Sequence, residues 1–393
     1  MINSTFCVLP WIHLYVGPNG DVLPCCQADH SLPLGNVDNH SITAILQSPT
    51  AIHLKQNMVA GKPSNECQRC YDLERHSLRS ERQIQNQVWE GMVESIIADP
   101  GVINPPVYLD IRLSNLCNLK CRMCSSYFSS AIQQEEKEIW GDNQGNKAVT
   151  YFKKKQRDFA LTEILSFMSH TEKIYFAGGE PLLSSEHYEI LQQLIDIDRT
   201  NVDLIYNTNL TNFKYKTLNV LDYWKKFKKV TVMASLDAQG EVAEYVRHGT
   251  SWHSILDNLQ MLRNQCDHVT VKITSAVGFM NIYSLMEMQK TCKLVDINNF
   301  YLSMLISPAH LTLQVLPQHH KNKLAQAIDQ HVAWCVDQGA VQLSHEWTNA
   351  KQFMFAQDCT NQLLEFKRIT QLLDFHRNES FADVLPQFKD LVC

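Results

Sequence analysis

From about residue 107 to residue 306, short apolar segments alternate with longer amphipathic ones. Segments rich in β-branched and aromatic residues predict strands, and those with helical spacing predict helices between them. Six strands are predicted, over 107–114, 173–179, 202–209, 229–237, 268–278 and 299–306. This alternation predicts an α/β fold with a parallel sheet, in the form of a partial (β/α)6 barrel. A flat doubly wound sheet is the alternative, and both folds place reactive groups at the strands' C-terminal ends.

The sequence on either side of this alternating region has a different character. Residues 1–90 hold five cysteines and predict a cysteine-rich module before the barrel, to which we assign residues 105–310. Residues 311–393 lack strand patterns and predict a helical C-terminal extension. Between the predicted strands we expect helices, among them one over 215–227.

Composition restricts the possible functions and the cellular compartment. The net charge of −6 disfavours a general nucleic-acid binder, which would carry a basic surplus. No apolar run approaches the roughly 20 residues of a membrane span, and the start of the sequence resembles no secretion signal. We therefore expect a cytoplasmic protein without a membrane partner. In that reducing compartment, thirteen cysteines indicate metal ligation more than disulfides.

The stretch NLCNLKCRMCSS (115–126) places three cysteines directly after the first predicted strand. Thiolate ligands select iron–sulfur clusters or zinc. A [4Fe–4S] cluster normally takes four cysteines, so three would leave one iron open to an outside ligand. A zinc site completed by a distant fourth residue is the alternative.

The spacing C-x3-C-x2-C in CNLKCRMC resembles the radical S-adenosylmethionine (SAM) superfamily. The resemblance implies that Cys117, Cys121 and Cys124 are catalytic and hold a [4Fe–4S] cluster whose open iron is chelated by SAM. An electron from the cluster would then split SAM, and the resulting 5′-deoxyadenosyl radical would abstract hydrogen from a substrate. The residue before the third cysteine, often aromatic in the family, is Met123, which can also pack against an adenine.

Two further segments resemble the SAM-binding parts of this superfamily. FAGGEPLL (176–183) combines a glycine pair, which permits close backbone approach, with a glutamate that can accept hydrogen bonds from an ammonium. VMASLDAQGEVAEYVRHG (232–249) would place Ser235 and Asp237 against the ribose and Arg247 against the carboxylate. The alternatives are a strand-to-helix turn at Glu180, a helix cap at Ser235 or Asp237, and an exposed Arg247. The predicted SAM-binding residues are Met123, Gly178, Gly179, Glu180, Pro181, Asn207, Asn209, Ser235, Asp237, Arg247 and Val277.

The cysteines of the N-terminal module form a second group, with GDVLPC at 20–25 and CQRC at 67–70. This pattern resembles the SPASM module and its shorter relative twitch, which add auxiliary [4Fe–4S] clusters to radical SAM barrels. Those modules usually follow the barrel, whereas this one precedes it. The resemblance implies one auxiliary cluster, with Cys26 left over and the ligands Cys7, Cys25, Cys67 and Cys70. A structural zinc site is the alternative.

Together these features predict a radical SAM oxidoreductase whose auxiliary cluster accepts an electron from the substrate. The expected substrate is a peptide or protein, undergoing oxidation, cross-linking or epimerisation, and the expected partner is an external reductant such as flavodoxin or ferredoxin. One alternative is oxidation of a small molecule such as a sugar. Another is modification of RNA, for which the only support is the short basic runs at 153–157 and 225–229. A zinc-stapled scaffold protein is the alternative without catalysis.

Overall fold

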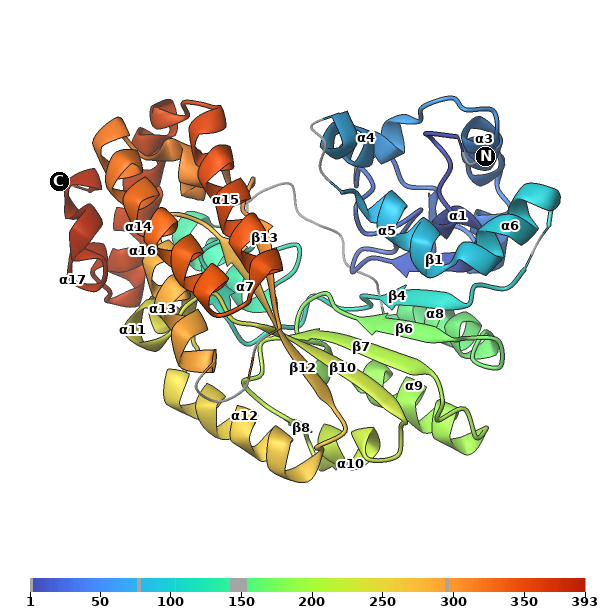
Figure 1. Cartoon of the computed structure of the whole chain (residues 1–393). Coiled ribbons are helices and arrows are strands. Elements are labelled where there is room, and N and C mark those ends of the chain that lie inside the picture. The colour runs from blue at the N-terminus through green and yellow to red at the C-terminus, as the bar shows by residue number, and fades with distance from the viewer. Residues whose placement is uncertain are drawn as a thin grey trace. The chain divides into compact units, whose positions relative to one another are not determined.

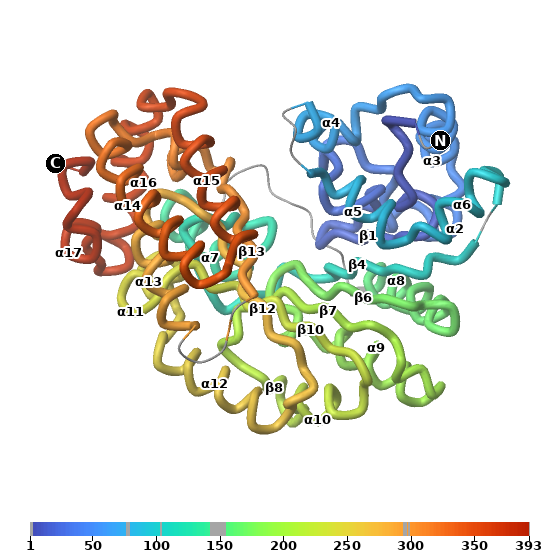
Figure 2. The backbone as a smooth tube through the Cα atoms, viewed as in Figure 1, coloured from blue at the N-terminus to red at the C-terminus, as the bar shows by residue number. Residues whose placement is uncertain are grey.

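The computed structural model describes residues 3–75, 79–102, 104–141, 154–293, 297 and 299–392. These residues group into two compact units, which interleave along the chain. The first unit lies within the ranges 1–117, 146–207 and 213–231, and the second within 118–145, 208–212 and 232–393. Figures 1 and 2 colour the chain from blue at the N-terminus to red at the C-terminus, so that the order of its segments can be followed.

The first unit is built on a sheet with the strand order β7-β6-β4-β1-β2-β3. Its four parallel strands are paired in register, for example Leu14 with Leu109 and Ile174 with Leu204. The two remaining strands, β2 and β3, run antiparallel to their neighbours. The strands are β1 (His13–Val16), β2 (Asp21–Leu23), β3 (Gly35–Asn36), β4 (Tyr108–Ile111), β6 (Lys173–Phe176) and β7 (Asp203–Thr208). The cysteine-rich segment therefore contributes a parallel strand, β1, beside the first strand predicted for the barrel.

Several helices of the first unit start at residues whose side chains cap the backbone. Ser41 and Ser48 accept hydrogen bonds from the backbone at the starts of α2 and α3, and Ser80 forms a capping box with Gln83 at α5. Figure 1 shows α8 and α9 beside strands β6 and β7. The helices are α1 (Leu9–Ile12), α2 (Ile42–Leu46), α3 (Pro49–Val59), α4 (Gln68–Arg75), α5 (Glu81–Val88), α6 (Glu90–Ala98), α8 (Lys154–Ser166), α9 (Ser185–Asp196) and α10 (Val220–Trp224), with 3-10 turns η1 (Asn65–Cys67) and η2 (Pro181–Leu183).

The helix predicted over 215–227 is wrong in its first part. A short hairpin of β8 (Lys214–Tyr215) and β9 (Leu218–Asn219) stands there, and only α10 (Val220–Trp224) is helical. Lys216 in the turn has a φ of 52°, which a right-handed helix cannot contain. The Asn219 side chain then accepts a hydrogen bond from the Leu221 backbone and starts the helix at the next residue.

The second unit combines parallel strands with the described C-terminal helices. Strand β10 (Lys229–Ser235) begins in the first unit and ends here, while β12 (Thr270–Val277) and β13 (Phe300–Met304) pair in parallel. A two-stranded antiparallel ribbon joins β5 (Lys120–Cys121) to β11 (Arg247–His248). The helices are α7 (Ser130–Trp140), α11 (Gly240–Val246), α12 (Trp252–Gln265), α13 (Ile282–Lys293), α14 (Gln318–Asp337), α15 (Val341–Ala356), α16 (Leu363–Arg377) and α17 (Phe381–Val384), with 3-10 turns η3 (Ala309–Leu311), η4 (Leu313–Val315), η5 (Thr360–Gln362) and η6 (Pro386–Leu391).

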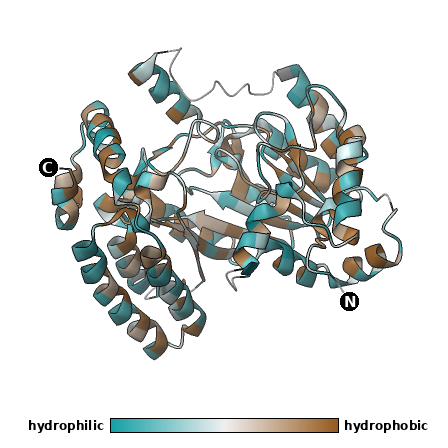
Figure 3. Ribbon diagram, turned by 90° about the horizontal axis from the view of Figure 1, so that it is seen from above, coloured by the Kyte–Doolittle hydropathy of each residue, from teal (hydrophilic) through white to brown (hydrophobic). Residues whose placement is uncertain are grey.

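The structure confirms the predicted α/β class, the six predicted strands and the helical character of the chain after residue 311. The sheet is mixed, because β2 and β3 add antiparallel strands that the sequence pattern did not predict. Figure 3 shows hydrophilic and hydrophobic residues alternating around the helices, as expected for helices with one buried face. Within the described ranges, no helix combines the length and apolarity required to cross a bilayer.

Candidate functional site

The glycine pair after β6 packs directly on the chain that leads into the three-cysteine loop. A Cβ atom on Gly179 would lie 2.3 Å from the Leu116 carbonyl oxygen, so no side chain fits there. Gly178 has a φ of 113°, which favours glycine. The backbone N–H of Gly179 donates to the Ser114 carbonyl (3.2 Å) and that of Glu180 to the Leu116 carbonyl (2.7 Å). The glycines therefore permit a backbone contact that positions the start of the loop.

Glu180 follows β6, and Asn207 lies near the same end of the neighbouring parallel strand β7, because Phe176 of β6 pairs with Tyr206 of β7. Glu180 is buried, and one of its carboxylate oxygens accepts a hydrogen bond from the Leu182 backbone (3.2 Å). This oxygen therefore caps the start of the 3-10 turn η2, in line with the alternative in which Glu180 belongs to a strand-to-helix turn. The side-chain oxygen of Asn207 is buried without a hydrogen-bond partner among the described residues. A buried acceptor of this kind fits a ligand that brings a donor, as the SAM ammonium does.

In the second unit, Arg247 and Cys121 face each other across the β5–β11 ribbon. The Arg247 guanidinium donates through Nε to Asp237 (2.6 Å), and its Nη1 lies 3.8 Å from the Cys121 sulfur. The other Asp237 oxygen accepts from the Ala276 backbone (2.7 Å). Burial raises the pKa of the Cys121 thiol, and the Arg247 charge opposes this rise. The Arg247 charge therefore offsets part of the cost of forming a Cys121 thiolate but does not remove that cost.

This ion pair bears on the predicted roles of its two members. Arg247 is 15% exposed and pairs with the buried Asp237, so it is not the exposed residue of the alternative interpretation. Helix α11 is preceded by Gln239 at its N-cap, without a side-chain bond, so neither Ser235 nor Asp237 caps it. The assignment of Ser235 and Asp237 to the SAM ribose, and of Arg247 to the SAM carboxylate, stays a prediction.

Arg122, between the second and third cysteines of the loop, anchors that loop to the C-terminal helices. Its side chain is only 2% exposed, and Nη2 donates to Asp374 and to Glu379, both at 2.6 Å. Its guanidinium carbon lies 3.8 Å from the centroid of the Tyr245 ring, within the range of a cation–π contact. Sequence reasoning missed this residue, and only its position within the C-x2-C spacing could have suggested it.

A second buried ion pair ties the same helices to the segment after the loop. Arg377, at the end of α16, donates to both oxygens of Glu135 in α7 at 3.0 and 2.6 Å. Glu135 also pairs with Lys120, the residue before the second cysteine, at 2.9 Å. The C-terminal extension thus contributes charged side chains that hold the cysteine loop.

The remaining predicted residues are placed as follows. Asn209 is buried and donates to the Asn118 side chain (3.1 Å), which fixes the start of the loop within the second unit. Val277 ends β12 and is fully buried. The residues with partial or full exposure are Cys117, Met123 and Ser235, which are half-buried, and Cys124, which is exposed.

Four cysteines of the N-terminal module each lie within electrostatic range of at least two others of the group. Burial is the main reason that the thiol pKa values of Cys7, Cys25, Cys67 and Cys70 are all raised. Mutual repulsion adds to this rise, from Cys67 and Cys70 on Cys7, and from Cys26, Cys7 and Cys67 on Cys25. Buried thiols gathered in this way are the donor set that a [4Fe–4S] cluster requires.

Cys26 repels Cys25, its neighbour in sequence, but the charges that act on Cys26 itself come from other residues. Burial raises its pKa to about 12, Asp110 adds to the rise, and Arg112 opposes it. Arg82, which sequence reasoning missed, lies within electrostatic range of the four-cysteine group. Its guanidinium donates to the Phe6 carbonyl (2.9 Å) and opposes the rise in pKa of three of those thiols, Cys7, Cys67 and Cys70.

Two protein families match the regions in which these sites lie. Residues 111–292 match the Radical SAM superfamily, and residues 7–71 match SPASM, described as an iron–sulfur cluster-binding domain. The chain thus contains a SPASM domain at residues 7–71 that precedes a radical SAM domain at residues 111–292. Both resemblances drawn from the sequence are confirmed, and with them the expectation of iron–sulfur clusters and SAM as cofactors.

Solved structures similar to this chain share little of its sequence. anSMEcpe with bound AdoMet is 17% identical over 60% of this chain and 62% of its own, with a TM-score of 0.42. anSMEcpe with AdoMet and the Cp18Cys peptide is 16% identical (58% and 60%, TM-score 0.40). Streptococcus suis SuiB bound to the precursor peptide SuiA is 13% identical (68% and 58%, TM-score 0.36). This chain spans about three-fifths of the length of these proteins. None of the curated proteins compared matches it.

Proposed function

We propose that this protein is a radical SAM oxidoreductase that removes hydrogen from a peptide or protein substrate. When bound, the cluster and SAM would supply a 5′-deoxyadenosyl radical that abstracts a hydrogen atom. The proposal depends mainly on one observation, the backbone contact between the Gly178–Gly179 pair and the chain entering the three-cysteine loop. That contact joins the two segments which, in this proposal, hold SAM and its cluster.

The proposed roles within the SAM site follow from the contacts of each residue. Cys117, Cys121 and Cys124 would be the cluster ligands, with Arg247 favouring the thiolate of Cys121. The buried Asn207 oxygen and the Glu180 carboxylate are suitable acceptors for the SAM ammonium. The backbone of Gly179, which carries no Cβ, would line the same site.

The SPASM domain supports net oxidation as the outcome. Four thiols of its cysteines lie within electrostatic range, so we propose Cys7, Cys25, Cys67 and Cys70 as ligands of one auxiliary [4Fe–4S] cluster. Such a cluster could take the electron left on the substrate after hydrogen abstraction. We propose a peptide as the substrate, because the Cp18Cys and SuiA molecules bound in the similar structures are peptides. An external flavodoxin or ferredoxin would deliver the first electron.

The test is anaerobic reconstitution with iron and sulfide, followed by SAM and dithionite. We expect about eight irons per chain and formation of 5′-deoxyadenosine. Deuterium transferred into 5′-deoxyadenosine from a labelled peptide would identify the substrate class. A colourless protein that binds only zinc and releases no 5′-deoxyadenosine would favour the scaffold alternative and refute the proposal.

A control pair separates the two cysteine sites. Cys117→Ala should abolish SAM cleavage. Cys70→Ala should keep some SAM cleavage without substrate turnover, and unimpaired turnover in this variant would contradict the electron-acceptor role of the auxiliary cluster.

A further inference from the structure

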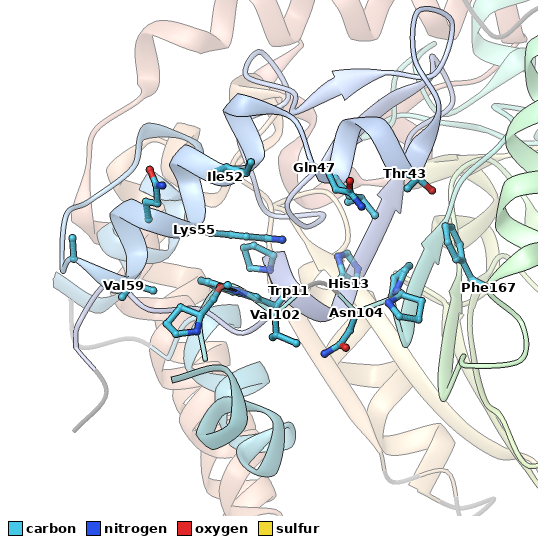
Figure 4. Close-up of a pocket in the computed structure, with 18 residues that line it drawn as sticks. Trp11, His13, Thr43, Gln47, Ile52, Lys55, Val59, Val102, Asn104 and Phe167 are labelled. Carbon is cyan, nitrogen blue, oxygen red and sulfur yellow. Dashed lines mark hydrogen bonds between the residues drawn. The ribbon is translucent and has the colours of Figure 1, made fainter. Parts of the chain in front are cut away.

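A cavity of about 730 Å³ lies in the first unit, and its lining contains no cysteine. Figure 4 shows it between helix α3, the Trp11 ring of α1 and the segment that precedes β4. Its volume falls within the range of about 300 to 1,000 Å³ that is typical of small-molecule sites. Most of its wall is apolar, formed by side chains that include Trp11, Ile52, Val59, Val102 and Phe167.

A single cation interrupts this apolar wall. The Lys55 ammonium lies 5.7 Å from the centroid of the Trp11 ring, and its side chain reaches toward that ring in Figure 4. No lining residue is acidic, and among the described residues no hydrogen bond or ion pair engages this ammonium. Burial lowers the pKa of Lys55, which indicates that its charge has lost part of its hydration.

The other titratable group in the wall, His13, cannot replace Lys55 as a positive charge. Its Nδ1 lies 3.2 Å from the Pro24 carbonyl oxygen, and burial lowers its pKa to about 4. The histidine is therefore neutral near pH 7. Any net charge that the cavity presents to a ligand at that pH comes from Lys55.

We propose that this cavity binds a small apolar monocarboxylate, with the carboxylate on Lys55 and the apolar body between Trp11 and the aliphatic wall. A carboxylate replaces the water lost around the ammonium with a charge-assisted hydrogen bond. A neutral ligand of the same shape would desolvate the ammonium further without this compensation, and a cationic ligand would be repelled. Burial of an alkyl chain supplies the remaining affinity, at about 0.8 kcal/mol per methylene group.

The test is anaerobic isothermal titration of the cluster-loaded full chain with octanoate, octanol and octylamine. We expect octanoate to bind at least about tenfold more tightly than octanol, and octylamine not to bind. Lys55→Met keeps the aliphatic stem and should reduce octanoate affinity to that of octanol. Lys62→Met removes an exposed lysine that does not line the cavity and should leave octanoate binding unchanged.

A second variant tests the charge without removing the lysine. Ile52 lies three residues before Lys55 on α3 and also lines the cavity, so Ile52→Glu would supply an ion-pair partner in place of the ligand. This variant should lose the preference for octanoate over octanol. Equal affinities for the two ligands in the unmodified protein, or octanoate binding that survives both substitutions, would overturn the proposal.

A peptide arm distinguishes a small acid from a protein C-terminus. A leucine-terminated tetrapeptide and its C-terminal amide are titrated under the same conditions. If the free peptide bound and octanoate did not, the ligand would be a chain end, and the small-acid assignment would be wrong. These titrations require no SAM cleavage, so their failure would leave the proposed enzymatic function untouched.

Discussion

Replacing Arg122 with methionine should destabilise the second unit strongly, because this guanidinium is buried against two carboxylates. Methionine has a similar length but removes both 2.6 Å contacts and the cation–π contact with Tyr245. Breaking a buried ion pair by removal of one partner costs about 3 to 5 kcal/mol. We expect the lower end, about 3 kcal/mol, since Glu379 keeps its contact with His248 and Asp374 keeps those with the Tyr245 hydroxyl and the Phe381 backbone.

The measurement is urea unfolding under anaerobic conditions, followed by circular dichroism, with the rate of iron release to a chelator as a second readout. Arg368→Met is the matched control, because Arg368 pairs with Glu365 on the same C-terminal helix but is 57% exposed. An exposed pair of this kind contributes about 0.5 kcal/mol or less. If the two variants differed by less than about 1 kcal/mol, the anchoring role of Arg122 would be refuted.

A further variant checks the physical cause. Asp374→Asn and Glu379→Gln, added to Arg122→Met, remove the carboxylates that the single variant leaves unpaired. We expect this triple variant to recover part of the lost stability. A triple variant less stable than Arg122→Met would mean that the carboxylates have other stabilising contacts.

Three further predictions concern the cysteine sites and the core of the first unit. Cys70→Ala should lower the iron content from about eight toward about four per chain, whereas Cys26→Ala should leave it unchanged; equal losses would contradict the ligand set. Gly179→Ala should cost about 3 kcal/mol, because its Cβ would overlap the Leu116 carbonyl, while Gly91→Ala in α6, where a Cβ meets nothing within 4 Å, should be neutral or stabilising. A cost of less than about 1 kcal/mol at Gly179 would show that the loop can move aside. Burial lowers the pKa of His187 from 6.5 to about 3, so the unfolded state binds the proton first, and stability is lost as the pH falls below 6.5. Between pH 7 and pH 5 the unmodified protein should lose about 2 kcal/mol more than His187→Gln in urea unfolding, and parallel losses would refute this assignment.

The six strands could be predicted because each depends on a local pattern. Strand β12, for example, alternates between buried and less buried residues along its length, and this alternation is visible in the sequence itself. Strand β1 was missed because His13–Val16 is only four residues long and follows a helical turn begun by Leu9 and Pro10. All four of its residues are buried by pairing with β4, some 95 positions away along the chain, which no local pattern reveals.

The site divides in the same way between contiguous motifs and distant partners. The three-cysteine loop and the glycine pair are contiguous, so their chemistry could be inferred before the fold was known. The partners of Arg122 lie 252 and 257 positions away in a helical extension that carries no recognisable motif. Tertiary packing alone brings these charges together, so only the structure could identify the extension as an anchor for the loop.

Each cysteine site also contains an arginine, at most 15% exposed, that pairs with a carboxylate. Arg247 is held by Asp237 beside Cys121, and Arg82 is held by Glu74 within range of the auxiliary thiols. Burial raises the thiol pKa values at both sites, and the arginine charge opposes the rise without cancelling it. Because each arginine is already paired with an acid, it adds only a partial positive field. The chain's own charges therefore leave the buried thiols largely protonated near pH 7, and metal binding must displace these protons.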